Sequence, residues 1–168
     1  MRTSDLLADA FGRIGDGVRR VLDGLGDDAL VWRPDPTANT VAWLVWHLAR
    51  GQDAQVAACA GTAQVWDADG WADRFDLPFA PGETGYGQTP EEVAQVVAPR
   101  ELLQGYLDAV QERSLAYVGT LSDDDLDRVV DDAWDPPVTL GVRLVSIVGD
   151  DLAHLGQAGY VKGLWGRR

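Results

Sequence analysis

Apolar residues recur at helical spacing in four long segments of the chain: residues 4–25, 39–60, 99–121 and 140–164. In the third segment, Leu103, Tyr106 and Val110 repeat at steps of three and four residues, which gives the helix one buried stripe. No segment alternates apolar and polar residues over enough positions to predict a strand. The pattern therefore predicts an all-α fold, an up-and-down four-helix bundle.

Several residues at the ends of these segments favour helix starts and stops. Asn39 stands where the second helix needs an N-cap, and Gly61 stands where that helix should end. The sequence Thr89-Pro90-Glu91-Glu92 forms a capping box with proline at the first helical position. These residues predict a second helix that ends at Ala60 and a short helix that begins after Thr89.

A long irregular segment, residues 61–90, connects the second and third predicted helices. A connection of this length is unusual in a compact domain, so it indicates a functional covering loop. We expect one domain over residues 1–168, with this segment as a long crossover. Aromatic residues are frequent in the crossover: Trp66, Trp71, Phe75, Phe79 and Tyr86.

Composition excludes some classes of partner. The formal net charge is −13 and Lys162 is the only lysine, which argues against nucleic acid, because phosphate backbones are bound by basic patches. Cys59 is the only cysteine, and no apolar run is long enough to cross a membrane, so we expect a cytoplasmic protein without membrane contact. Seven tryptophans are compatible with a homodimer, although the sequence leaves the oligomeric state open.

One of the two histidines, His154, has carboxylates beside it on the fourth predicted helix. Asp150 precedes it by four residues and Asp151 by three. Side chains at these spacings lie about 5–6 Å apart on one helical face. An imidazole and a carboxylate at that separation can bind the same ion, and the pair suits zinc, nickel, iron or manganese.

The other histidine, His47, lies on the second predicted helix. Trp43, Trp46 and Arg50 share its stripe, which indicates a walled pocket around the imidazole. Both histidines fall on parts of long helices that should face the bundle. The sequence therefore predicts one divalent metal ion bound between two helices by His47 and His154.

A simpler interpretation of the same residues stays open. A histidine beside tryptophans is often a hydrogen-bonded core residue, and an aspartate four residues before a histidine often forms a salt bridge. Cys59 is excluded as a further ligand beside His47, because twelve residues of regular helix separate the two by about 18 Å along the axis.

Three segments resemble signatures of the DinB-like superfamily, a group of metal-binding four-helix bundles that also contains mycothiol-dependent maleylpyruvate isomerases. The likeness covers essentially the whole chain. Within the superfamily, the sequence resembles an actinobacterial branch of unassigned function. The segments are Asn39-Thr40-Val41-Ala42-Trp43-Leu44-Val45-Trp46-His47-Leu48 on the second helix, Thr84-Gly85-Tyr86-Gly87 in the crossover and His154-Leu155-Gly156-Gln157 on the last helix.

The resemblance implies a set of metal ligands. Family members present one histidine from the second helix and a His-x-x-x-His pair from the last, which correspond here to His47, Asp150 and His154. Asp150 thus stands where the family has a histidine. Asp151 is then either a substitute ligand or an acceptor for an imidazole N–H, and zinc or nickel is the expected ion.

The resemblance also implies an activity. It implies a metal-dependent enzyme that either transfers a low-molecular-weight thiol to a small electrophile or uses the thiol to isomerise the electrophile. The expected thiol is mycothiol. Trp43, Trp46 and Gln157 would then contact the substrate, and Arg50 would pair with an acidic group. Two alternatives stay open: a non-catalytic metal- or ligand-binding stress protein with a degenerate site, and a metal-dependent hydrolase in which Asp151 is the catalytic base.

Overall fold

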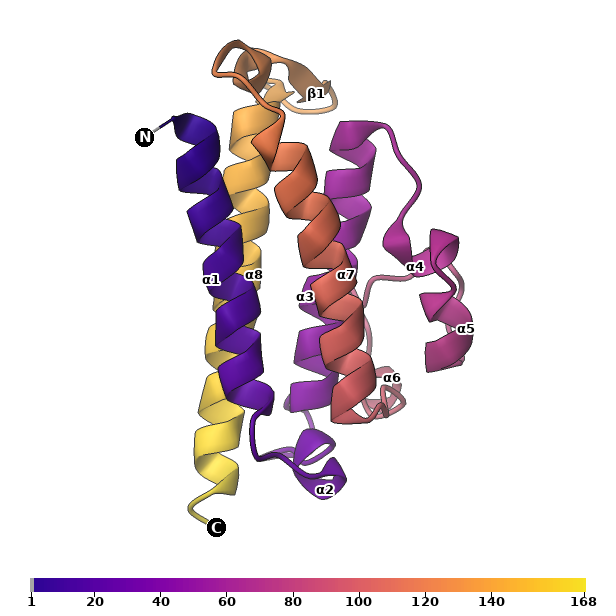
Figure 1. The fold of residues 1–168 in the computed structure, drawn as a ribbon. Helices are drawn as coiled ribbons and strands as arrows, with labels where there is room; N and C mark the ends of the chain where they lie inside the picture. The colour runs from indigo at the N-terminus through magenta and orange to yellow at the C-terminus, as the bar shows by residue number, and fades with distance from the viewer. Residues whose placement is uncertain (1) are drawn as a thin grey trace.

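The computed structural model describes residues 2–168, and within this range four long helices pack side by side (Figure 1). They are α1 (Thr3–Leu22), α3 (Val41–Ala60), α7 (Arg100–Gly119) and α8 (Leu140–Trp165). The predicted all-α class and the four long helices are therefore confirmed. None of the helices in residues 2–168 is both long and apolar enough to cross a membrane.

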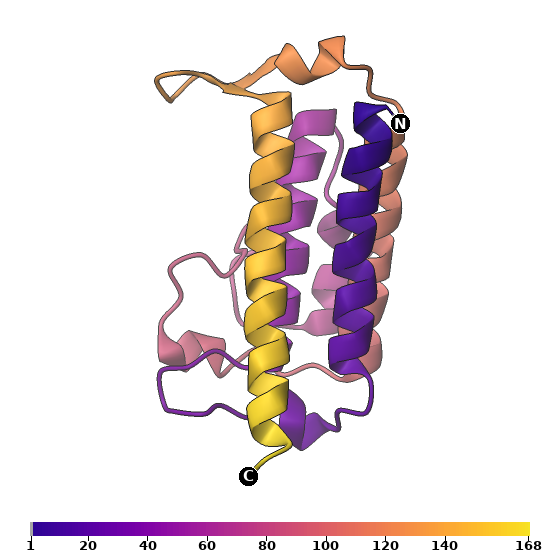
Figure 2. The same cartoon turned by 90° about the vertical axis from the view of Figure 1, so that its left-hand side faces the viewer.

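The crossover sets the direction of the helices. Because it returns the chain along the whole bundle, α3 and α7 run in the same direction, whereas α1 and α8 run opposite to them (Figures 1 and 2). Hydrogen bonds agree with this parallel arrangement of α3 and α7. Arg50 of α3 donates to the hydroxyl of Tyr106 on α7, and closer to the C-terminal ends of both helices the hydroxyl of Tyr117 donates to the backbone carbonyl of Cys59. Helix α8 consequently lies antiparallel to α3 along the seam where both histidines are found.

The structure corrects one predicted helix start and confirms two other caps. Thr40, not Asn39, is the N-cap of α3, because its Oγ1 accepts a hydrogen bond from the backbone N–H of Trp43. Gly61 ends α3 in the left-handed conformation, with φ of 67°. The capping box from Thr89 to Glu92 is present and begins the short helix α6 (Pro90–Val93).

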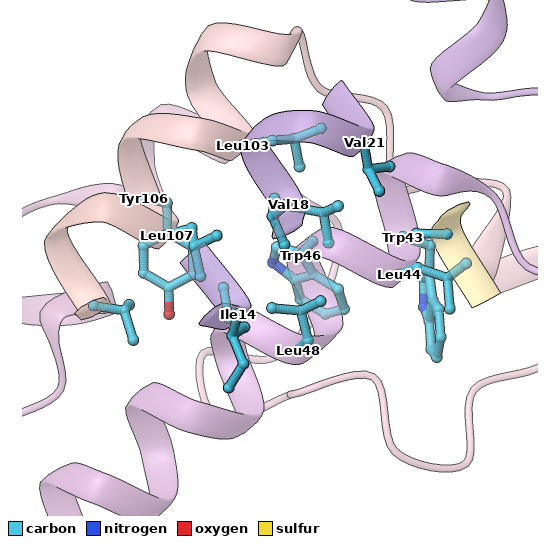
Figure 3. Packing of buried hydrophobic residues seen from close by; sticks show 14 of the residues in the cluster. Ile14, Val18, Val21, Trp43, Leu44, Trp46, Leu48, Leu103, Tyr106 and Leu107 are labelled. Atoms are coloured by element: carbon cyan, nitrogen blue, oxygen red, sulfur yellow. The ribbon is translucent and has the colours of Figure 1, made fainter. Parts of the chain in front are cut away.

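The core runs along the bundle axis and is made mostly of aliphatic side chains. Ile14, Leu48 and Leu107 are fully buried and face one another from α1, α3 and α7 (Figure 3). Burial of each such side chain stabilises the fold by about 1.5–3 kcal/mol. The larger Trp46 and Tyr106 fill the same layer toward the crossover.

A small hairpin was not predicted from the sequence. Its strands β1 (Val129–Asp131) and β2 (Val138–Thr139) pair antiparallel at one end of the bundle, after the 3₁₀ helix η1 (Asp124–Asp127). Strands of two and three residues show too few alternations to register as a periodic pattern.

The crossover is folded onto α3 and α7, and it contains the short helices α4 (Val65–Ala68) and α5 (Trp71–Phe75). The buried Asp53 carboxylate holds its start, because it accepts hydrogen bonds from the backbone N–H groups of residues 65 and 66 at 2.9 and 2.8 Å. Trp66 and Phe75 pack against Tyr106 of α7. The remaining short helix, α2 (Asp27–Leu30), links α1 to α3.

Candidate metal centre

Three potential ligands meet at the seam between α3 and α8. His47 from α3 and Asp150 and His154 from α8 each offer one donor atom, and these atoms all lie within 4.8 Å of one another. Ligands of a tetrahedral ion lie about 3.4 Å apart when each bond is about 2.1 Å long. The Asp150 side chain is 52% exposed, so it is free to rotate and close that difference.

The imidazole of His47 is held in one orientation. Its ring stacks on the indole of Trp43, with centroids 4.5 Å apart and planes 14° from parallel. Its Nδ1 is hydrogen-bonded to the backbone carbonyl of Thr84 in the crossover. Because a carbonyl only accepts, Nδ1 carries the hydrogen and Nε2 keeps its lone pair for a metal ion.

His154 is oriented in the same way from its own helix. Its Nδ1 lies 2.9 Å from the backbone carbonyl of Asp150, so this nitrogen is again the donor and Nε2 is again free of hydrogen. The two imidazole rings meet edge to face across the seam, with centroids 4.6 Å apart and planes 70° from parallel. Both histidines therefore keep a lone pair on Nε2.

The electrostatics of the site suit a divalent cation. Burial lowers the pKa of His47, and this outweighs the opposing effect of the Thr84 carbonyl, so the imidazole stays in the neutral form that binds metals. The neighbouring Asp150 carboxylate supplies one negative charge. Two imidazoles and one carboxylate fit zinc or nickel, which prefer this mixture of nitrogen and oxygen ligands.

The crossover reaches His47 only because residue 85 is a glycine. Gly85 has φ of 96°, and a Cβ built on it would lie 2.7 Å from Nδ1 of His47 and 3.0–3.1 Å from the rings of Trp46 and Trp43. Gln88 completes the contact, since its Oε1 accepts a hydrogen bond of 2.8 Å from the Trp43 indole. The segment from Thr84 to Gln88 therefore covers one side of the site.

We expect Gly85→Ala to destabilise the protein by about 1–3 kcal/mol and to weaken zinc binding. Alanine is strained at the positive φ of this residue, and its Cβ would collide with His47 and displace the imidazole. Gly87→Ala is the matched control: Gly87 has φ of 74°, but a Cβ there meets no atom within 4 Å. Urea unfolding and zinc titration of both variants measure the two effects. Equal zinc affinity in the two variants would show that the loop does not orient His47.

Arg50 and Trp46 lie under the crossover. The guanidinium of Arg50 is fully buried and donates to Gln64, to Tyr106 and to the backbone carbonyls of residues 81 and 83. Trp46 is 1% exposed and packs against aromatic residues of the crossover. Both side chains contact the crossover, and the substrate contacts expected of them from the sequence stay a prediction.

Asp151 lies one helical turn before His154 on α8, and Gln157 lies one turn after it. The Asp151 side chain is 1% exposed, and its Oδ2 has no hydrogen-bond partner among the described residues. Burial, and then the charge of Asp150, raise the pKa of the Asp151 carboxyl well above its usual range. Gln157 is exposed one turn further along α8, on the outer surface of the seam.

Sequence reasoning missed the residues of the crossover that support the site. Thr84 contributes only its backbone carbonyl, which leaves no mark on the sequence, and Gln88 reaches Trp43 across 45 positions. The signal that could have located them is the pair of glycines at 85 and 87, both with positive φ.

Known proteins similar to this chain agree with its fold. The sequence matches the DinB superfamily over residues 10–158. The crystal structure of a conserved protein from Enterococcus faecalis superposes with a TM-score of 0.90, at 32% sequence identity and with 96% of each chain covered. A comparison with curated proteins gives no match. The family match covers α3, the crossover and α7 and most of α1 and α8, and the chain belongs to the DinB superfamily.

Proposed function

We propose that this protein binds one divalent metal ion, zinc or nickel, through His47, Asp150 and His154 and uses it to transfer a low-molecular-weight thiol to a small electrophile. The observation that carries the proposal is the orientation of the two imidazoles. Backbone carbonyls of Thr84 and Asp150 accept from Nδ1 of each ring, so that each Nε2 keeps a lone pair, and one donor atom from each ring lies within 4.8 Å of the other and of Asp150. Three protein ligands leave a coordination position for a substrate.

An ion bound there would lower the pKa of a coordinated thiol and hold its sulfur as a thiolate. The charges of the protein suit such a ligand. His47 and His154 are neutral in their ligand form and Asp150 contributes −1, so the occupied site has a net charge of about +1. One thiolate neutralises this charge. Aspartate in place of the family's histidine thus favours a single anionic ligand.

Trp43 is the residue best placed to contact the electrophile. Its indole stacks on His47 and lies 6.4 Å, centroid to centroid, from the ring of His154, and 6% of the residue is exposed. An aromatic or unsaturated electrophile can contact the apolar surface that this exposed part offers beside the donor atoms. We propose that the thiolate of mycothiol attacks the electrophile. A C–S bond forms, and the electrophile either loses a halide ion or, at an unsaturated carbon, opens its π bond and takes up the proton that the thiol released.

A measurement of thiol consumption tests this function. We expect zinc-loaded protein to accelerate the loss of free thiol in the presence of monochlorobimane or chlorodinitrobenzene, and His154→Ala to reduce the acceleration by at least about 100-fold. Cys59→Ala is the control, because Cys59 is buried and burial raises the pKa of its thiol, so its own sulfur should add nothing. Equal rates for the native protein and His154→Ala would contradict the proposal.

Metal-dependent hydrolysis is less well supported. In that reaction Asp151 would act as the base, but the residue is 1% exposed and burial raises the pKa of its carboxyl, which disfavours the ionised form that a base needs. A non-catalytic binding protein is the remaining alternative. Zinc binding and thiol binding without turnover would identify it.

A further inference from the structure

The side of α8 that points away from α1 and α3 is exposed and apolar (Figure 2). Val145 is 64% exposed, Leu152 is 43% exposed and Tyr160 is 65% exposed. Asp150 is the only exposed residue between positions 142 and 160 that is ionised at neutral pH. An exposed apolar surface of this kind is typical of a contact with another molecule.

The residues of this surface follow one stripe along the helix. At 100° per residue, seven exposed positions fall within about 100° around the axis of α8. We call them the α8 face: Val142, Val145, Gly149, Leu152, Ala153, Gly156 and Tyr160.

The order of residues in the α8 face is symmetric about the middle of the helix. Gly149 and Gly156 are equally far from the point between Leu152 and Ala153, and so are positions 145 and 160. A two-fold axis brings the same surface of two copies together, so the surface must be complementary to itself. A helix face with this spacing meets that condition when two copies lie antiparallel.

The two glycines of the α8 face have no packing role within residues 2–168. A Cβ added at Gly149 or at Gly156 would meet no atom within 4 Å. Glycine within a helix costs about 0.5–1 kcal/mol relative to alanine. Gly17 on α1 differs, because a Cβ there would collide with the side chain of Leu155. Space above Gly149 and Gly156 allows the backbone of another helix to come close.

The charge of the chain limits which surface can bind a second copy. Two copies with a net charge of −13 each repel one another, so their contact must avoid like charges. The outer side of α1 carries ion pairs such as Asp9 with Arg13, and α7 exposes Glu112 and Arg113. None of the seven residues of the α8 face is charged at neutral pH.

The segments at the two ends of α8 carry opposite charges. The hairpin before the helix exposes Asp132 and Asp135, and Arg167 and Arg168 are exposed after its last turn, at the opposite end of the bundle (Figure 2). Antiparallel pairing about the middle of α8 brings the basic end of one copy to the level of the acidic hairpin of the other. Parallel pairing would bring the two acidic hairpins together, so charge complementarity favours the antiparallel arrangement.

We propose that this protein forms a homodimer through the α8 face, with the two copies of α8 antiparallel and the two-fold axis beside Leu152 and Ala153. Gly149 of each copy then lies opposite Gly156 of the other. The dimer does not depend on the proposed thiol function, because none of the three metal-ligand candidates belongs to the α8 face.

Analytical ultracentrifugation of the full chain tests the contact. We expect the mass of two chains at micromolar protein concentration. Leu152→Glu should raise the dissociation constant of the dimer by at least about 100-fold, because the two-fold axis brings the two new carboxylates close together. Leu6→Glu is the matched control, since Leu6 is 56% exposed but lies on α1. A native protein with the mass of one chain, or a dimer that Leu152→Glu leaves intact, would overturn the proposal.

Disulfide cross-linking tests the antiparallel arrangement in a Cys59→Ala background. We expect Ala153→Cys to cross-link to its own copy under mild oxidation, because both thiols lie beside the two-fold axis. Val142→Cys is the matched control: it belongs to the α8 face, but antiparallel pairing separates it from its copy by about 30 Å along the helix. A dimer in which Ala153→Cys fails to cross-link, or in which Val142→Cys cross-links as readily, would overturn the proposed arrangement.

Discussion

We expect His154→Ala to lower the affinity of the protein for Zn²⁺ by more than about 100-fold. Removal of a residue that only orients a metal ligand costs about 10–100-fold, so loss of the ligand itself should cost more. Competition with a chromophoric chelator measures the affinity directly. Thermal melting gives an independent reading, because an ion at 100 times its Kd stabilises the native state by about 2.7 kcal/mol.

The neighbouring aspartates provide the control for this prediction. Asp150 belongs to the group of three donors, whereas the buried Asp151 does not. Asp150→Asn should therefore weaken zinc binding and Asp151→Asn should weaken it much less. If His154→Ala and the native protein bind zinc equally, the seam is not a metal site, and the Asp150–His154 contact is only the salt bridge that the sequence left open.

The bundle could be predicted from the sequence because its four main helices are long and carry apolar residues at helical spacing. The predicted fourth helix, residues 140–164, differs from α8 by one residue at its end. Short elements were predicted less well. Helices α4 and α5 and the hairpin are too short for a period to register, and they are held by distant groups such as the Asp53 carboxylate.

The residues of the candidate site also differ in whether their positions could be predicted from the sequence. His47 and His154 could be paired because each lies on the bundle-facing side of a long helix. The positions of Trp46 and Arg50 could not be predicted, because α3 is buried on nearly all sides and helical angle alone does not separate the seam from the crossover. That distinction depends on the folded crossover, whose backbone carbonyls accept hydrogen bonds from Arg50 and His47 and so determine which side chains of α3 it covers.

Asp151 is the one site residue whose position opposes stability. A buried carboxyl without a partner at Oδ2 destabilises the folded state when it is ionised, since the charge loses its hydration without gaining a hydrogen bond. Leucine or valine would fill an interior position of α8 without this penalty. Packing alone therefore does not explain an aspartate at this position.

We expect Asp151→Asn to stabilise the metal-free protein by about 1–3 kcal/mol at neutral pH, because the amide stays uncharged. The sign follows from the raised pKa of Asp151: the folded state binds the proton more tightly than the unfolded state does. The contribution of the carboxyl is thus fully favourable below its unfolded pKa of about 3.9 and is lost as the pH rises through the folded value. The advantage of the variant should grow from about pH 4 upward.

Urea unfolding between pH 4 and pH 8, with chelator present, measures this difference. Asp150→Asn is the matched control, because the Asp150 side chain is half exposed and its replacement should change stability by no more than about 0.5 kcal/mol. A stability difference for Asp151→Asn that does not vary with pH would mean that the carboxyl is not protonated by burial. If Asp151→Asn is more stable than the native protein but also binds zinc more weakly, the Asp151 carboxyl supports metal binding and destabilises the fold.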